Sequence, residues 1–112
     1  MQTYDVISVP IANEDGHDNR RRPAVIVSTS KLAQDIGVHW ACMITSQENA
    51  GQPGDIEIID LETAGLKHSS VIRPSKMVTV ETAEARRIGN LTAPAIERLE
   101  GTLKQYLQLV AS

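Results

Sequence analysis

The feature that most constrains the fold is a change of hydrophobic period near residue 92. Before that point, short Val- and Ile-rich runs stop at Gly, Pro or polar residues, which is the pattern of short β-strands. After it, apolar residues recur every three or four positions, the period of one helix face. This order predicts a mainly β chain, with a small, strongly bent antiparallel sheet or barrel and one C-terminal helix covering apolar surface.

The predicted elements can be placed along the chain. Pro74 is expected to end the strand that begins at Ser70, because proline lacks the N–H that a sheet ladder needs. The helix is predicted over about 93–110, with Thr92 as its N-cap and Pro94 in its first turn. Its apolar face comprises Ile96, Leu99, Leu103, Tyr106, Leu107 and Val110. We expect strands at 4–9, 24–28, 38–45, 56–59, 70–72, 77–80 and 85–88, and a short helical turn at 31–35.

Composition indicates what kind of core such a chain can form. A length of 112 residues predicts a single domain, 1–112, with one modest core. Because the chain has no Phe and only 3% aromatic residues, that core has to be aliphatic. We expect Trp40 in the core or in an interface. Cys42 is the only cysteine, so it can form neither an intrachain disulfide nor a CxxC zinc site, and we expect a small buried hydrophobe.

Several functional classes are disfavoured by what the sequence lacks. The N-terminus has neither the basic start nor the long apolar run of a signal peptide. No apolar stretch approaches the roughly 20 residues of a membrane span. We therefore expect a soluble cytoplasmic protein with no membrane partner. The three histidines show no metal-ligand spacing, and we predict neither a metal nor a cofactor.

Charge is distributed unevenly, although the net charge is only −3. Residues 47–62 hold five acidic side chains and no Lys or Arg, whereas residues 67–87 hold five basic side chains and two acidic ones. Arg20, Arg21 and Arg22 form a second basic focus just before Pro23. Such asymmetry can concentrate an anionic partner on one face of an acidic chain. The alternative is a set of solvated loops of mixed sign.

Strand alternation narrows the possible chemistry. In the run HWACMITS, Cys42 and Thr45 point to opposite faces, as do Cys42 and His39, so neither pairing forms a nucleophilic site. What remains is a set of cations and hydroxyls: His17, Arg20, Arg21, Arg22, Thr45, Arg73 and Lys76. Arginine presents a fork of donors suited to phosphate oxygens, and a threonine hydroxyl can add a hydrogen bond. The set favours a metal-free phosphodiester site, against the alternative of arginines in surface ion pairs and a threonine in a turn.

Four segments in order carry a family resemblance. They are RRPAVIVS, ACMITS, AGLKHSSVIRPSKMVTV and ARRIGNL, followed by the amphipathic helix. Over residues 4 to about 109, this series resembles the PemK/MazF (Kid) family of bacterial toxins, the ribonuclease halves of type II toxin–antitoxin modules. The resemblance implies an SH3-like small barrel with a C-terminal helix and usually a homodimer.

The resemblance also implies an activity and partners. The expected reaction is metal-independent, sequence-specific cleavage of single-stranded mRNA, leaving a 2′,3′-cyclic phosphate and a 5′-hydroxyl. The expected partners are this RNA and a cognate antitoxin, with DNA bound only through the antitoxin complex. The general features of such a site, a phosphate clamp and donors for a pentacoordinate transition state, agree with the cation and hydroxyl set.

Matching motif to motif gives the candidate site residues. The arginine before the RP proline corresponds to Arg22 and the hydroxyl at the ITS strand end to Thr45, both expected to be catalytic. His17 and Arg73 match a loop histidine and an arginine of the plasmid-borne members, and we expect both to be catalytic as well. Those members carry an acid two residues after that arginine, where this chain has Ser75, so the general base is in question and His17 is the candidate to move a proton. We expect contacts to RNA from Arg20, Arg21, Ser46, Lys67, Ser75 and Lys76.

Two alternatives remain open from sequence. One is a gyrase poison of the CcdB type, which shares the fold by resemblance. It is disfavoured because the Trp-Gly-Ile end of those proteins is absent from the C-terminal QYLQLVAS. The other is a catalytically inactive SH3-like module that binds RNA or protein, which Ser75 keeps in consideration. The sequence does not specify the RNA bases recognised or the antitoxin.

Overall fold

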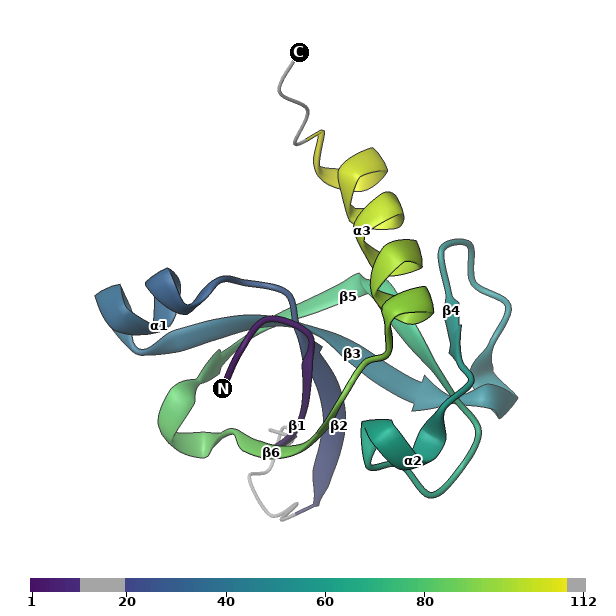
Figure 1. Ribbon diagram of the computed structural model, residues 1–112, viewed down its shortest axis with the longest axis horizontal. Coiled ribbons are helices and arrows are strands. Elements are labelled where there is room, and N and C mark those ends of the chain that lie inside the picture. The colour runs from purple at the N-terminus through teal and green to yellow at the C-terminus, as the bar shows by residue number, and fades with distance from the viewer. Residues whose placement is uncertain (11–19, 109–112) are drawn as a thin grey trace, which may run out of the picture.

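A curled antiparallel sheet of six strands forms the centre of the protein, as the computed structural model shows (Figure 1). The structure describes residues 1–10 and 20–108. The order across the sheet is β4-β5-β3-β2-β1-β6. The mainly β fold with a C-terminal helix is therefore confirmed. The strands are β1 (Asp5–Pro10), β2 (Arg21–Ile26), β3 (Val38–Ser46), β4 (Ile56–Ile58), β5 (Ser70–Glu81) and β6 (Arg86–Asn90).

The central strand β3 separates two aliphatic cores. Successive side chains of a strand point to opposite faces, and Cys42 and Ile44 enter one core while Ala41 and Met43 contact the other. The alternation predicted for this strand is thus confirmed. The second core consists of Ile7, Val9, Ala24, Ile26, Ala41, Val80 and Ala85, with Met43 and Val78 at its margin.

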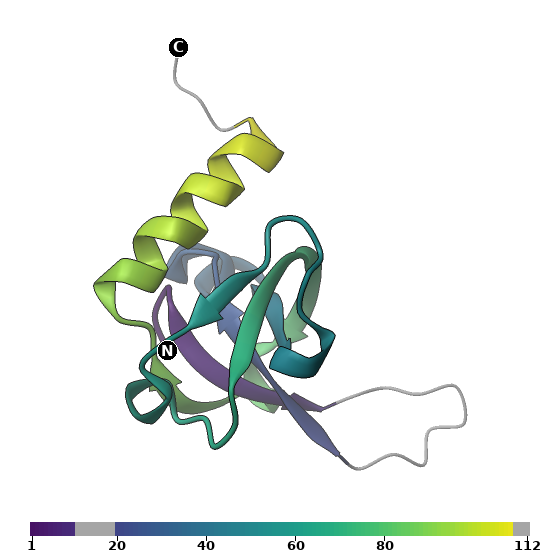
Figure 2. The same ribbon diagram turned by 90° about the vertical axis from the view of Figure 1, so that its right-hand side faces the viewer.

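Helix α3 (Ala93–Leu107) covers the core that contains Cys42 and Ile44 (Figure 2). Thr92 is its N-cap residue and Pro94 lies in its first turn, as predicted, although the Thr92 side chain makes no capping hydrogen bond. Leu99 is fully buried and Leu103 is 9% exposed. The predicted apolar face is wrong at its C-terminal end, because Tyr106 and Leu107 are about half exposed. The helix has passed the edge of the sheet there; Val110 lies outside the described residues.

Strand β5 corrects the prediction that Pro74 ends a strand. The strand runs through Pro74 to Glu81 and pairs with β3 on both sides of residues 74–76. The register shifts between Cys42, whose partner is Met77, and Met43, whose partner is Arg73. Residues 74–76 therefore form a bulge, and a buried proline is tolerated there because no ladder hydrogen bond is required of it.

The structure also tests three other expectations about β2 and β3. Strand β2 begins at Arg21, three residues before the predicted start, so the arginine run enters the sheet. Trp40 is 50% exposed and does not belong to the core. Cys42 is fully buried, as expected of a small hydrophobe, and burial raises the pKa of its thiol to about 11.

Short helical elements connect the strands. They are α1 (Ser30–Ile36), α2 (Leu61–Ala64) and the single turns η1 (Gln47–Asn49) and η2 (Thr82–Glu84). Helix α2 packs closely on β6, since Gly65 and Gly89 lie against the backbone of the opposite element. Within the described residues, no helix is long and apolar enough to cross a membrane.

Candidate active site

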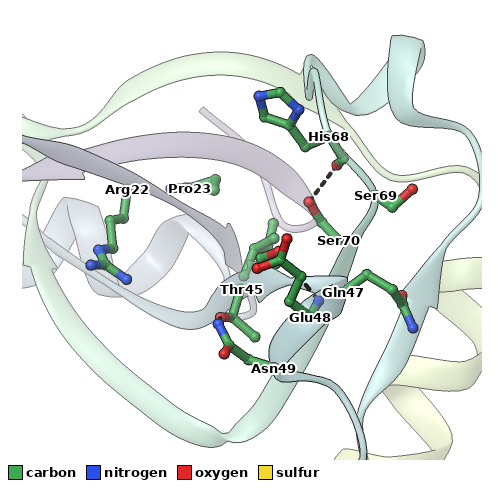
Figure 3. Close-up of a pocket in the computed structure, with 11 residues that line it drawn as sticks. Arg22, Pro23, Thr45, Gln47, Glu48, Asn49, His68, Ser69 and Ser70 are labelled. Carbon is green, nitrogen blue, oxygen red and sulfur yellow. Dashed lines mark hydrogen bonds between the residues drawn. The ribbon is translucent and has the colours of Figure 1, made fainter.

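An open pocket of about 610 Å³ lies where β3 ends (Figure 3). Strand β2 forms one wall, the turn η1 forms another, and the loop before β5 closes a third side. Nine of its eleven lining residues have polar side chains. The lining residues are Arg22, Pro23, Ile44, Thr45, Ser46, Gln47, Glu48, Asn49, His68, Ser69 and Ser70.

The pocket brings Arg22 and Thr45 together, although 22 residues separate them in the chain. Strands β2 and β3 are antiparallel, and Ala24 pairs with Met43. Arg22 precedes Ala24 by two residues and Thr45 follows Met43 by two, so both side chains belong to the same face of the sheet. Arg22 is held in β2 by its pairing with Val9 on the neighbouring strand. A rigid sheet therefore presents the guanidinium and the hydroxyl to the same pocket.

The hydroxyl of Thr45 has a defined hydrogen-bond role. It accepts a hydrogen bond from Nδ2 of Asn49 at 3.2 Å. A hydroxyl has one proton to donate, and no hydrogen bond from the Thr45 hydroxyl to another group occurs within the described residues. The proton can therefore be given to an oxygen of a bound anion. Beside it, Oγ of Ser46 accepts from the backbone N–H of Glu48 at 3.3 Å and begins η1.

Two groups in the lining were not predicted from the sequence. His68 comes from the loop before β5, and Glu48 comes from η1. The backbone N–H of Gln47 donates to the carbonyl of Ser69 at 2.9 Å, which joins η1 to this loop. Ser46 also pairs with Ser70 across the β3–β5 ladder. A signal was present in the sequence, because the KHSS stretch immediately precedes the strand that pairs with the end of β3.

Arg73 does not line this pocket. Its Nε and Nη2 donate to the two carboxylate oxygens of Asp55 at 3.0 and 2.9 Å, and Nη2 also donates to the carbonyl of Asn49 at 2.7 Å. Asp55 in turn accepts from the backbone N–H groups of Gly51 and Gln52. Hydrogen bonding to Arg73 is the main cause that holds the pKa of Asp55 below its usual value, and the same pair raises the pKa of Arg73. The arginine thus fastens the 49–55 loop.

Other predicted contact residues are also distributed away from the pocket. Arg21 donates to the hydroxyl and carbonyl of Ser8 and to the carbonyl of Glu84, so it links β1 to η2. The hydroxyl of Ser75 accepts a hydrogen bond from the side chain of Gln52. Arg20 and Lys67 are exposed and lie outside the pocket lining. His17 falls outside the described residues, so its prediction is neither supported nor opposed.

A second open pocket, of about 790 Å³, shares Arg22 with the first. Its lining includes the apolar residues Val9, Met43 and Val78, together with Lys76 and two acids of the β5–η2 region. Arg22 therefore stands between two pockets. In the described part of the chain, no group of three His, Cys, Asp or Glu residues could hold a metal ion.

The fold is a curled β-sheet with one covering helix, and an arginine lines a hydroxyl-rich pocket at a strand end. The sequence matches the family model of the PemK-like, MazF-like toxins of type II toxin–antitoxin systems over residues 2–107. The chain belongs to this family, whose members are toxins with endoribonuclease activity. No curated protein sequence matches the chain closely.

Solved structures with the same fold come from the same family. A MazE–MazF complex from Deinococcus radiodurans has a TM-score of 0.75 at 19% identity, covering 98% of this chain and 97% of that one. The Mycobacterium tuberculosis toxin MazF-mt6 has a TM-score of 0.72 at 17% identity, with 95% and 98% covered. An endoribonuclease in complex with its cognate antitoxin, from a mycobacterial species, has a TM-score of 0.74 at 16% identity, with 100% and 99% covered. At such identities the likeness concerns the fold.

Proposed function

We propose that this protein is the toxin of a type II toxin–antitoxin module and cleaves single-stranded mRNA at a specific short sequence without a metal ion. The observation that carries the proposal is the convergence of Arg22 and Thr45 in one pocket at the end of β3. The two groups are a permanent cation and a hydroxyl donor, and both suit a phosphodiester. Family membership supports the same class of reaction.

The proposed reaction is an internal transesterification. The ribose 2′-oxygen attacks the adjacent phosphorus, the bond from phosphorus to the 5′-oxygen breaks, and the products are a 2′,3′-cyclic phosphate and a 5′-hydroxyl. Negative charge accumulates on the phosphoryl oxygens in the pentacoordinate transition state. Arg22 and Thr45 are placed to stabilise that charge from a rigid sheet, and a well-placed donor of this kind contributes about 3–4 kcal/mol.

The rest of the RNA strand is proposed to follow the basic side of the molecule. Arg22 lines both pockets, so a strand held there reaches Lys76 in the lining of the second one. Ser46 lines the first pocket. Arg20 and Lys67 are exposed and lie close in sequence to the lining residues Arg22 and His68. Arg21, Arg73 and Ser75 act in this scheme through the loops and strands they fasten.

The proposed partners follow from the same family. Two of the solved structures described above are complexes, one with MazE and one with a cognate antitoxin. We propose that an acidic antitoxin segment covers Arg22 and excludes RNA from the pocket. The toxin is proposed to act in the bacterial cytoplasm as a homodimer, and to reach DNA only through the antitoxin complex. Light scattering at micromolar concentration checks the dimer, and a stable monomer would contradict it.

A cleavage assay tests the activity. The purified chain is mixed with a long single-stranded RNA of mixed sequence, with EDTA present, and the 5′ ends of the fragments are sequenced. We expect cuts at one short sequence, with 5′-hydroxyl and cyclic phosphate ends. Cleavage that EDTA abolishes and magnesium restores would refute the proposed chemistry. RNA binding without cleavage would instead support the inactive SH3-like module.

Substitution of Arg22 tests the site. Arg22→Lys keeps the charge but loses the two-pronged contact with phosphate, so we expect the rate to fall by about 10²–10³-fold. The matched control is Arg98→Lys on the exposed side of α3, outside the first pocket. Circular dichroism checks that both variants fold. A normal rate for Arg22→Lys would move the catalytic role to another basic residue.

A further inference from the structure

Internal transesterification needs two proton transfers, and the site described so far supplies neither. The 2′-hydroxyl loses a proton as it attacks, and the departing 5′-oxygen gains one. Arginine stays protonated and cannot serve as a base, and a threonine hydroxyl is a poor acid or base near neutrality. The lining of the pocket, however, includes one carboxylate, Glu48, and one imidazole, His68.

We propose that Glu48 is the general base and His68 the general acid of this pocket. The inference rests on the ribonuclease function proposed above and adds the residues that move its protons. A glutamate carboxylate is ready to accept a proton near neutral pH, and imidazole is the side chain best able to give one there. Among the described residues that line the pocket, these two are the only ionisable groups besides Arg22.

Both residues are held in place by the surrounding backbone. Glu48 lies in η1. The backbone N–H of Glu48 donates to Oγ of Ser46, which caps the start of this turn. His68 is held at its carbonyl, which accepts a hydrogen bond from Oγ of Ser70 at 2.7 Å. The hydrogen bond from Gln47 N–H to the Ser69 carbonyl joins the two segments. The backbone under each side chain is therefore fixed relative to the other and to Thr45.

The side chains are also accessible to a substrate. Glu48 and His68 are exposed, whereas Ile44 and Ser70 on the adjoining strands are buried. Figure 3 shows the carboxylate of Glu48 and the imidazole of His68 extending from different segments around the end of β3, with Arg22 on the β2 side. A phosphodiester contacting Arg22 and Thr45 would have a carboxylate and an imidazole around it.

The proton balance of the step is complete with these groups. Glu48 takes the proton of the 2′-hydroxyl as the 2′-oxygen forms its bond to phosphorus. The bond from phosphorus to the 5′-oxygen breaks, the oxygen keeps the electron pair, and His68 in its imidazolium form gives it a proton. The site then holds a protonated carboxyl and a neutral imidazole, and exchange with water restores both.

The proposal also bears on the acid that the family pattern leads one to expect at position 75. In this chain Ser75 contacts Gln52 on the loop. The carboxylate that pairs with Arg73 is Asp55, which four hydrogen bonds hold in a structural role. Glu48 is the acid that lines the pocket. In this proposal Glu48, from η1, replaces the base that the family pattern places at position 75.

The pH dependence of kcat tests the roles. Wild type, Glu48→Gln and His68→Ala are compared on an RNA oligonucleotide that carries one mapped cleavage site. We expect a bell-shaped profile for wild type, loss of the acidic limb in Glu48→Gln and loss of the basic limb in His68→Ala, each with a rate about 10²–10⁴-fold lower. Free imidazole should partly restore His68→Ala. Glu57→Gln, on the exposed side of β4, is the matched control.

The outcomes separate this inference from the function on which it rests. If wild type cleaves RNA while His68→Ala keeps both its rate and its basic limb, the role of His68 is refuted and the function stands. A basic limb that disappears in His17→Ala instead would refute the role of His68 and assign the general acid to His17. A wild-type chain that does not cleave RNA under any of these conditions would refute the function and the proton transfers together.

Discussion

The packing of α2 on β6 predicts that one chemical change has opposite effects at two glycines. An added Cβ on Gly89 would lie 2.5 Å from the carbonyl oxygens of Thr63 and Ala64, and these backbone atoms can yield only if α2 moves away from the strand. An added Cβ on Gly101, in the middle of α3, meets nothing within 4 Å. Gly89→Ala should therefore destabilise the fold and Gly101→Ala should stabilise it.

The magnitudes follow from these surroundings. Overpacking against groups that cannot yield costs about 1–3 kcal/mol, and replacing an exposed mid-helix glycine by alanine contributes roughly 0.5–1 kcal/mol. The two variants should differ by about 2–4 kcal/mol in free energy of unfolding, or on the order of 10 °C in melting temperature.

Urea unfolding followed by circular dichroism measures this difference. Because α2 leads into the loop that carries His68, Gly89→Ala should also slow cleavage under conditions where it is fully folded. Equal stabilisation by both substitutions would refute the reasoning, since it would mean that α2 and β6 separate at no cost.

Three further predictions concern other parts of the molecule. Leu99→Ala should lower the free energy of unfolding by about 2–5 kcal/mol, whereas Leu107→Ala, at a half-exposed position of the same helix, should change it little; urea unfolding decides. Burial lowers the pKa of His39, and the nearby N-terminal charge adds to this. Stability should then fall as pH drops below the unfolded histidine value of about 6.5, and His39→Leu should remove that component from a pH series. If Arg73 acts by holding the loop through Asp55, removing the side chains of both residues should slow cleavage no more than removing either one alone. Additive losses of rate would instead indicate that Arg73 contacts RNA.

The parts of the fold that depend on local pattern could be predicted from the sequence. The spacing of Leu99 and Leu103 indicated the buried face of α3, and the alternation around Cys42 assigned its side chain to the correct face of β3. The prediction failed at Pro74, because whether a proline ends a strand depends on the partner strand. In this sheet a bulge leaves residues 74–76 without partners, and no local feature of the sequence shows where a bulge forms.

The site was predictable only where residues lie on regular strands. Arg22 and Thr45 could be placed because strand ends and alternation determine them, and the structure brings them into one pocket. Glu48 and His68 were missed because their position depends on how the end of β3 pairs with the start of β5. That pairing, Ser46 with Ser70, is a tertiary contact between segments about twenty residues apart.

The structure also changes the physical meaning of the basic residues between 67 and 87. In sequence they form one cationic block, but the bulge and the 49–55 loop divide it. Arg73 lies before the bulge, where the carboxylate of Asp55 neutralises it and draws it into the loop. Lys76 lies at the bulge and opens onto the second pocket beside Arg22. A phosphate approaching this face therefore meets Arg22 as the cation common to both pockets, while Arg73 has its positive charge already compensated. For this reason we expect Arg22 rather than Arg73 to stabilise the negative charge of the transition state, although both arginines lie on the same sheet.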